Sequence, residues 1–131
     1  MYAASHAYAA NLYQNVTVES GVESASPHRL IALLLEGAIE RAGAARVALM
    51  NGDVRLARDK VGATLAILAE LRNSLDHGKG GALSADLDAL YEYVQQRLMA
   101  APREQNQEAV LESMDLLSQV YAAWLDIGRV E

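Results

Sequence analysis

Cysteine and phenylalanine are absent from this sequence, and proline and tryptophan are scarce. Its 131 residues include no Cys, no Phe, two Pro and one Trp. Without cysteine the chain has no disulfide, no thiolate metal ligand and no thiol nucleophile. The few prolines leave room for long helices, and the apolar residues are mostly Ala, Leu and Val, a helix-forming mixture. The sequence therefore predicts an all-α protein with a single helical domain.

Basic residues are in the minority, and long apolar runs are missing. Eleven Lys and Arg against seventeen Asp and Glu give a formal net charge of −6. This charge opposes binding to a polyphosphate, so we expect no nucleic-acid partner. No stretch approaches the about 18 apolar residues of a membrane-spanning helix, and the start lacks the basic and apolar regions of a signal peptide. We therefore expect a cytoplasmic protein without membrane insertion.

Capping residues divide the first half of the chain. Residues 1–25 show no sustained helical period and are expected to form a flexible, mobile N-terminal arm. Ser26 and Pro27 predict an N-cap and first helical residue, and residues 26–128 are expected to form the bundle domain. The pair Asn51-Gly52 predicts a turn, after which Asp53 caps a second helix.

Breakers divide the second half in the same way. The glycine-rich run 78–81 predicts that the second helix stops near His77, with Ser84 capping the third helix. Pro102 predicts an exit near Ala101, and Asn106 caps a fourth helix. Loops this short force neighbouring helices to be antiparallel. The expected fold is an antiparallel up-and-down four-helix bundle.

Three of the four predicted helices carry more apolar surface than one core stripe requires. The third helix has a single stripe that includes Tyr91, Val94 and Leu98. The other helices carry a second apolar row or a widened arc, which predicts a groove for an amphipathic helix or apolar tail. The alternative, that these rows only widen the core, stays open. The candidate groove residues are Ile31, Leu35, Leu56, Ile67, Leu116, Val120 and Ile127.

Catalytic and metal-binding patterns are weak. The three histidines are far apart in sequence and lack the spacing of a carboxylate-bridged metal site, so we expect no metal, no cofactor and no enzymatic activity. Glu36 and Glu40 share a polar helix face with His28 and are interpreted as solvated. The glycines around Lys79 lack the full phosphate-loop spacing. The alternative function is a histidine phosphotransfer-type bundle, but His77 lies at a predicted helix end rather than mid-helix.

The chain contains a series of short motifs: Tyr13-Gln14-Asn15-Val16, Val22-Glu23-Ser24-Ala25-Ser26-Pro27, Leu33-Leu34-Leu35-Glu36-Gly37-Ala38-Ile39, Ser74-Leu75-Asp76, Gly80-Gly81, Asp86-Leu87-Asp88-Ala89-Leu90-Tyr91-Glu92-Tyr93 and Ala123-Trp124. In this order and spacing, the motifs closely resemble those of the flagellar export chaperone family FliS. The likeness covers about 110 residues, and the family's usual aromatic-Asp pair before Gly-Ala-Ile is Leu35-Glu36 in this chain.

This resemblance implies a non-enzymatic chaperone that binds the disordered C-terminal segment of flagellin, prevents premature polymerisation and delivers flagellin to the flagellar type III export gate components. It also implies that the N-terminal segment, with Tyr13, lies over part of the client surface. The resemblance leaves open which flagellin is the client and whether the free protein forms a weak homodimer.

Overall fold

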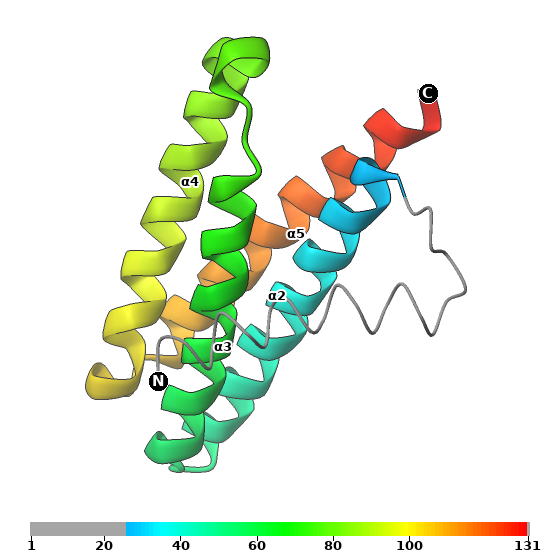
Figure 1. Cartoon of the computed structure of the whole chain (residues 1–131). Coiled ribbons are helices and arrows are strands. Elements are labelled where there is room, and N and C mark those ends of the chain that lie inside the picture. The colour runs from blue at the N-terminus through cyan, green and yellow to red at the C-terminus, as the bar shows by residue number, and fades with distance from the viewer. Residues whose placement is uncertain (1–25, 131) are drawn as a thin grey trace.

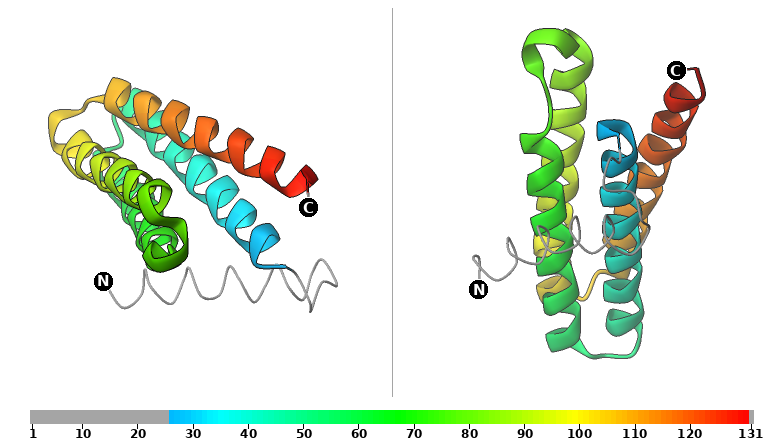
Figure 2. Two further views of the ribbon diagram at one scale, coloured as in Figure 1. Left: turned by 90° about the horizontal axis from the view of Figure 1, so that it is seen from above. Right: turned by 45° about the vertical axis from the view of Figure 1, so that its right-hand side comes forward.

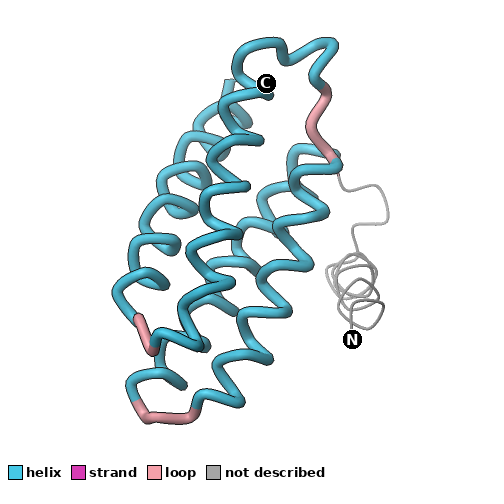
Figure 3. The backbone as a smooth tube through the Cα atoms, turned by 90° about the vertical axis from the view of Figure 1, so that its left-hand side faces the viewer, coloured by secondary structure: helices cyan, strands magenta, loops and turns pink. Residues whose placement is uncertain are grey.

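The computed structural model describes residues 26–130, which form four helices joined by short loops (Figure 3). The helices are α2 (Pro27–Met50), α3 (Val54–Asn73), α4 (His77–Glu104) and α5 (Gln107–Val130). Consecutive helices run in opposite directions, and α5 returns to pack against α2 (Figures 1 and 2). The predicted all-α, up-and-down bundle is confirmed, whereas the predicted arm over residues 1–25 lies outside the described residues.

The predicted caps at three helix starts are confirmed. The Ser26 hydroxyl accepts the Arg29 backbone N–H at 3.1 Å, with Pro27 as the first helical residue. The Asp53 carboxylate accepts the N–H of Leu56 at 3.0 Å and caps α3. Asn106 caps α5 by accepting the Ala109 N–H at 3.1 Å. Each of these side chains satisfies a backbone donor that has no partner inside the helix.

The boundary between α3 and α4 differs from the prediction. α3 ends at Asn73, and the glycine-rich segment forms the first turn of α4 instead of a loop. Asp76, not Ser84, is the cap, since its carboxylate accepts the Lys79 N–H at 3.1 Å. The helical path breaks only at Gly81, where φ is 53° and ψ is −125°. A strong cap therefore starts a helix in spite of the glycines. Among them, only Gly81 has a positive φ, the conformation that favours glycine.

The exit of α4 lies slightly beyond the predicted position near Ala101. Pro102 is buried within the last turn, the helix runs to Glu104, and Gln105 follows in the left-handed region with φ of 50° and ψ of 42°. A proline so close to the end removes one hydrogen bond, yet the final turn still forms.

The core lies along the bundle axis and uses many small residues. Five buried alanines of α2 lie in it, and Gly43 of α2 is so near α5 that a Cβ there would sit 3.3 Å from Met114 Cε. The predicted stripe of the third helix is confirmed, because Tyr91, Val94 and Leu98 are buried. Burial raises the pKa of Tyr91 to about 12, so its hydroxyl stays neutral at physiological pH.

Candidate partner-binding surface

The second apolar row of α5 changes from buried to exposed along the helix. Ala109 and Ile127 are separated by about five helical turns and so lie at the same angle around the helix. Ala109 is only 1% exposed, whereas Ile127 is 45% exposed. Leu116 and Val120, between them, are half-buried against the core. The row therefore begins as core and becomes surface toward the C-terminal half of α5.

The inward stripe of α4 shows the same change in the opposite chain direction. Leu98 is fully buried, Leu87 and Leu90 are half-buried, and Leu83 is 61% exposed. Leu83 was missed by the sequence analysis because the glycine-rich segment was interpreted as a helix stop just before it. The signal was nevertheless present, since Leu83, Leu87 and Leu90 follow the i, i+4, i+7 spacing of one helix face.

Both rows lose their cover because the two helices diverge. α4 and α5 start together at the loop that joins them and separate toward the N-terminal end of α4 and the C-terminal end of α5 (Figures 1 and 2). The apolar rows of α4 and α5 continue from the core into these separated ends. We call these residues the α4–α5 apolar surface: Leu83, Leu87, Leu90, Leu116, Val120, Ala123 and Ile127.

Polar contacts hold α4 and α5 together near their loop. The Glu112 carboxylate of α5 accepts hydrogen bonds from the Tyr93 hydroxyl at 3.0 and 3.1 Å and from Arg97 Nε at 2.8 Å. The hydrogen bond from Arg97, followed by that from Tyr93, lowers the pKa of the Glu112 carboxyl. These contacts fix the point from which the two helices separate.

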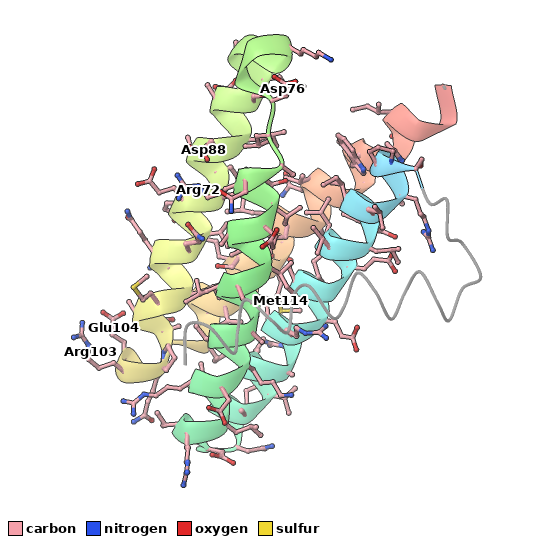
Figure 4. All side chains as sticks on the ribbon, viewed as in Figure 1. Arg72, Asp76, Asp88, Arg103, Glu104 and Met114 are labelled. Atoms are coloured by element: carbon pink, nitrogen blue, oxygen red, sulfur yellow. The ribbon has the colours of Figure 1, made fainter. Side chains whose placement is uncertain are left out.

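The N-terminal half of α4 is tied instead to α3. Arg72 of α3 donates to both carboxylate oxygens of Asp88, at 2.7 and 3.1 Å, and to the Gln95 side-chain oxygen at 2.9 Å (Figure 4). A bidentate guanidinium–carboxylate pair fixes orientation as well as distance. Arg72 therefore fixes the part of α4 that carries the exposed apolar residues against α3.

α5 is tied to α2 at both of its ends. Near the start of α5, Arg46 Nε donates to the Gln107 side-chain oxygen at 2.8 Å. In its C-terminal half, Trp124 Nε1 donates to the backbone carbonyl of His28 at 2.9 Å, and His28 Nε2 lies 2.6 Å from the backbone carbonyl oxygen of Trp124. Since a carbonyl only accepts, this His28 nitrogen carries a proton. The two rings are stacked, with centroids 4.7 Å apart and planes at 9°.

The structure separates the candidate groove residues into three groups. Leu116, Val120 and Ile127 lie together on the α4–α5 apolar surface. Leu35 and Ile67 are fully buried in the core, so neither is exposed in the free protein, and a partner-binding role for them stays a prediction. The reason for their burial is that α2 and α3 each pack against two neighbours and need a wide apolar arc for the core itself.

The other candidate residues lie elsewhere. Ile31 is half-buried against the core near the start of α2. Leu56 is 42% exposed at the start of α3, at the opposite end of the bundle from Ile127. Val47 and Met50, at the end of α2 and close to Leu56, are also exposed. Tyr13 lies outside the described residues. The partner-binding role of each of these residues stays a prediction.

The structure also gives the positions of the acidic residues and histidines that the sequence analysis considered. Glu36 and Glu40 are exposed on α2 as predicted, whereas His28 is half-buried against Trp124 instead of lying free on that face. His77 begins α4 rather than ending the helix before it. Within residues 26–130 no group of three or more His, Asp or Glu is placed to hold a metal ion, and no helix is long and apolar enough to cross a membrane.

Comparisons with known proteins agree with the motifs. The family model described as "Flagellar protein FliS" matches residues 9–131. The chain belongs to the FliS family. A flagellar secretion chaperone FliS of Salmonella typhimurium is 38% identical over 129 residues, which cover 98% of this chain and 93% of that protein. The flagellar secretion chaperone FliSB of Pseudomonas aeruginosa is 37% identical over 117 residues, covering 89% and 93%.

A more distant FliS, from Vibrio cholerae, is 28% identical over 112 residues, which cover 86% of this chain and 82% of that protein. The resemblance deduced from the short motifs is therefore confirmed, and the chain is placed in a family of flagellar secretion chaperones. An export-chaperone role follows from this membership, and no catalytic activity is indicated by the family.

Proposed function

We propose that this FliS-family protein is a cytoplasmic, non-enzymatic export chaperone that binds the disordered C-terminal segment of flagellin. Binding prevents premature polymerisation, and the complex delivers flagellin to the export gate components of the flagellar type III apparatus. The observation that carries the proposal is the α4–α5 apolar surface, which the free bundle leaves partly open to water.

An amphipathic client segment matches this surface in its chemistry. The exposed side chains are aliphatic, with Leu83 61% and Ile127 45% exposed, and they repeat at helical spacing on two helices. A disordered segment that folds as it binds can lay one apolar face along such rows. Burial of that area gives a negative heat-capacity change on binding.

Calorimetry with the full chain and a cognate flagellin C-terminal peptide tests the proposal. We expect binding with a clearly negative heat-capacity change between about 10 and 35 °C. Ile127→Asp and Val120→Asp should weaken it, since a charge would be buried without a partner in the complex. The matched control is Ser118→Asp, which adds the same charge at an exposed position on the side of α5 that faces away from Val120.

Absence of peptide binding and loss of specificity for the α4–α5 apolar surface would give different results. Absence of heat, together with absence of co-elution with the cognate flagellin, would refute flagellin binding. Equal weakening by Ser118→Asp and Ile127→Asp would show that charge, rather than loss of an apolar contact, reduces binding, and would remove the α4–α5 apolar surface from the proposal.

A further inference from the structure

The contact between His28 and Trp124 joins parts of the chain that are 96 residues apart. It combines two hydrogen bonds in opposite directions, at 2.6 and 2.9 Å, with a parallel ring stack. Each residue uses both its ring nitrogen and its backbone carbonyl. The contact therefore fixes the first turn of α2 against the C-terminal half of α5 in position and in rotation.

This contact lies where α5 runs along α2. With Arg46 and Gln107 at the other end, it holds α5 along α2. The contacts of Glu112 with Tyr93 and Arg97 lie in the half of α4 and α5 near their loop, while Arg72 holds the N-terminal half of α4 on α3. α2 and α3 pack against each other most extensively, but at the end where α4 begins and α5 ends, α5 follows α2 and α4 follows α3, so the two pairs separate there (Figures 1 and 2).

Where α4 and α5 separate, apolar side chains are exposed to water, which is unfavourable in free energy. Leu83 and Ile127 stay exposed to water, and the hydrophobic effect favours movement of α5 toward α4 to cover them. Because α2 is packed extensively against α3, a movement of α5 toward α4 leaves α2 behind, carries Trp124 away from His28 and breaks both hydrogen bonds and the stack. The His28–Trp124 contact opposes the closure that burial favours.

We propose that His28 is a positioning residue that holds α5 away from α4 and so keeps the α4–α5 apolar surface open for its partner. His28 does this through Trp124 and lies outside that surface. Its effect on the partner rests on the proposed function, whereas its effect on the separation of the two helices does not.

The helix separation can be measured directly because the chain contains no cysteine. Spin labels on Ala89→Cys of α4 and Ala122→Cys of α5, both exposed, report the distance between the diverging helices. We expect His28→Ala to move the distance distribution to shorter values. His28→Gln, which can still donate an amide N–H to the Trp124 carbonyl, should recover much of the original distribution.

The matched control is Arg46→Ala, which removes the hydrogen bond at the other end of the same two helices. We expect this variant to leave the distance distribution unchanged. A second readout is the fluorescence of Trp124, the single tryptophan of the chain, whose emission should change in His28→Ala and stay unchanged in Arg46→Ala. A distribution that is the same in wild type and His28→Ala, with the emission altered, overturns the proposal.

Binding of the flagellin C-terminal peptide then tests whether the position of α5 affects the affinity for the partner. If only about one molecule in ten of His28→Ala is open, its apparent affinity for the flagellin C-terminal peptide falls about tenfold. His28→Gln should recover affinity in parallel with the distance. Unchanged affinity in spite of a shortened distance refutes the step to the partner. Failure of the wild type to bind the peptide refutes the proposed function, while the distance measurement still decides the role of His28.

Discussion

At the scale of single residues, apolar chemistry alone does not separate core from surface. Ile67 and Leu56 lie on the same side of one helix and were both predicted as groove residues, yet Ile67 is fully buried and Leu56 is 42% exposed. Leu56 lies in the first turn of α3, at the edge of the bundle, whereas Ile67 lies deeper between neighbouring helices. Distance from the end of the bundle decides exposure here, and a helical period carries no information about it.

Ile67→Ala and Leu56→Ala should therefore differ strongly in their effects on folding. We expect Ile67→Ala to lower the free energy of unfolding by about 2–5 kcal/mol, because it leaves a cavity in a close-packed core. Leu56→Ala should cost less than about 1 kcal/mol, because much of its side chain already contacts water. Urea denaturation of both variants checks this. Equal losses would mean that Leu56 belongs to the core.

The Glu112 carboxyl should make stability depend on acid pH. Its pKa is lowered in the folded state by Arg97 and Tyr93, so the unfolded chain binds more protons between the folded pKa and the ordinary value of about 4.3. Its contribution is full above the unfolded pKa and is lost as pH falls through the folded pKa. Melting temperatures from pH 7 to pH 2 should fall less steeply for Glu112→Gln. An unchanged slope would contradict this.

At the scale of helices, most of the fold could be predicted because caps are local. Ser26, Asp53 and Asn106 bond to backbone groups three residues away, so a short sequence window contains the whole interaction. The α3–α4 boundary was misplaced because two local signals compete there, the cap at Asp76 and the glycines after it. The cap also has a more distant contact, since the Ser84 hydroxyl donates to the Asp76 backbone carbonyl at 3.1 Å from beyond the break.

The candidate site could be predicted only in part, because helical spacing is a local signal and tertiary contacts are not. The row containing Leu116, Val120 and Ile127 followed from helical spacing. The divergence of α4 and α5 that exposes this row depends on tertiary contacts such as that between His28 and Trp124. Because these two residues are 96 positions apart and neither belongs to a motif that demands the other, the sequence carried no sign of their pairing.

Two glycines within helices should respond to alanine in opposite ways. Gly62 lies inside α3, and a Cβ added to it would have no other atom within 4 Å, so Gly62→Ala should stabilise the protein by about 0.5–1 kcal/mol. Gly81→Ala should destabilise it by about 1–3 kcal/mol, because the positive φ at this break disfavours any side chain. Thermal melts of the two variants provide the comparison. Stabilisation by Gly81→Ala would show that the break is dispensable.

At the scale of the whole molecule, an open apolar surface favours self-association when no partner is present. We expect a weak, concentration-dependent homodimer of the free protein, detectable by sedimentation at high protein concentration. Ile127→Asp should abolish it, and addition of the flagellin peptide should compete with it. A purely monomeric protein at all concentrations, or a dimer insensitive to Ile127→Asp, would show that the α4–α5 apolar surface does not mediate self-contact.

The return of α5 to α2 also has a kinetic consequence. The other helix pairs, α2 with α3, α3 with α4 and α4 with α5, are consecutive in the chain, so they require only short loop closures. The pairing of His28 with Trp124 closes a loop of 96 residues, and the conformational entropy of that closure is lost only when the other helices are in place. We expect this contact to form after the folding transition state, so that His28→Ala accelerates unfolding and leaves the refolding rate almost unchanged. Stopped-flow chevron plots would measure both rates, and a slowed refolding rate would place the contact in the nucleus instead.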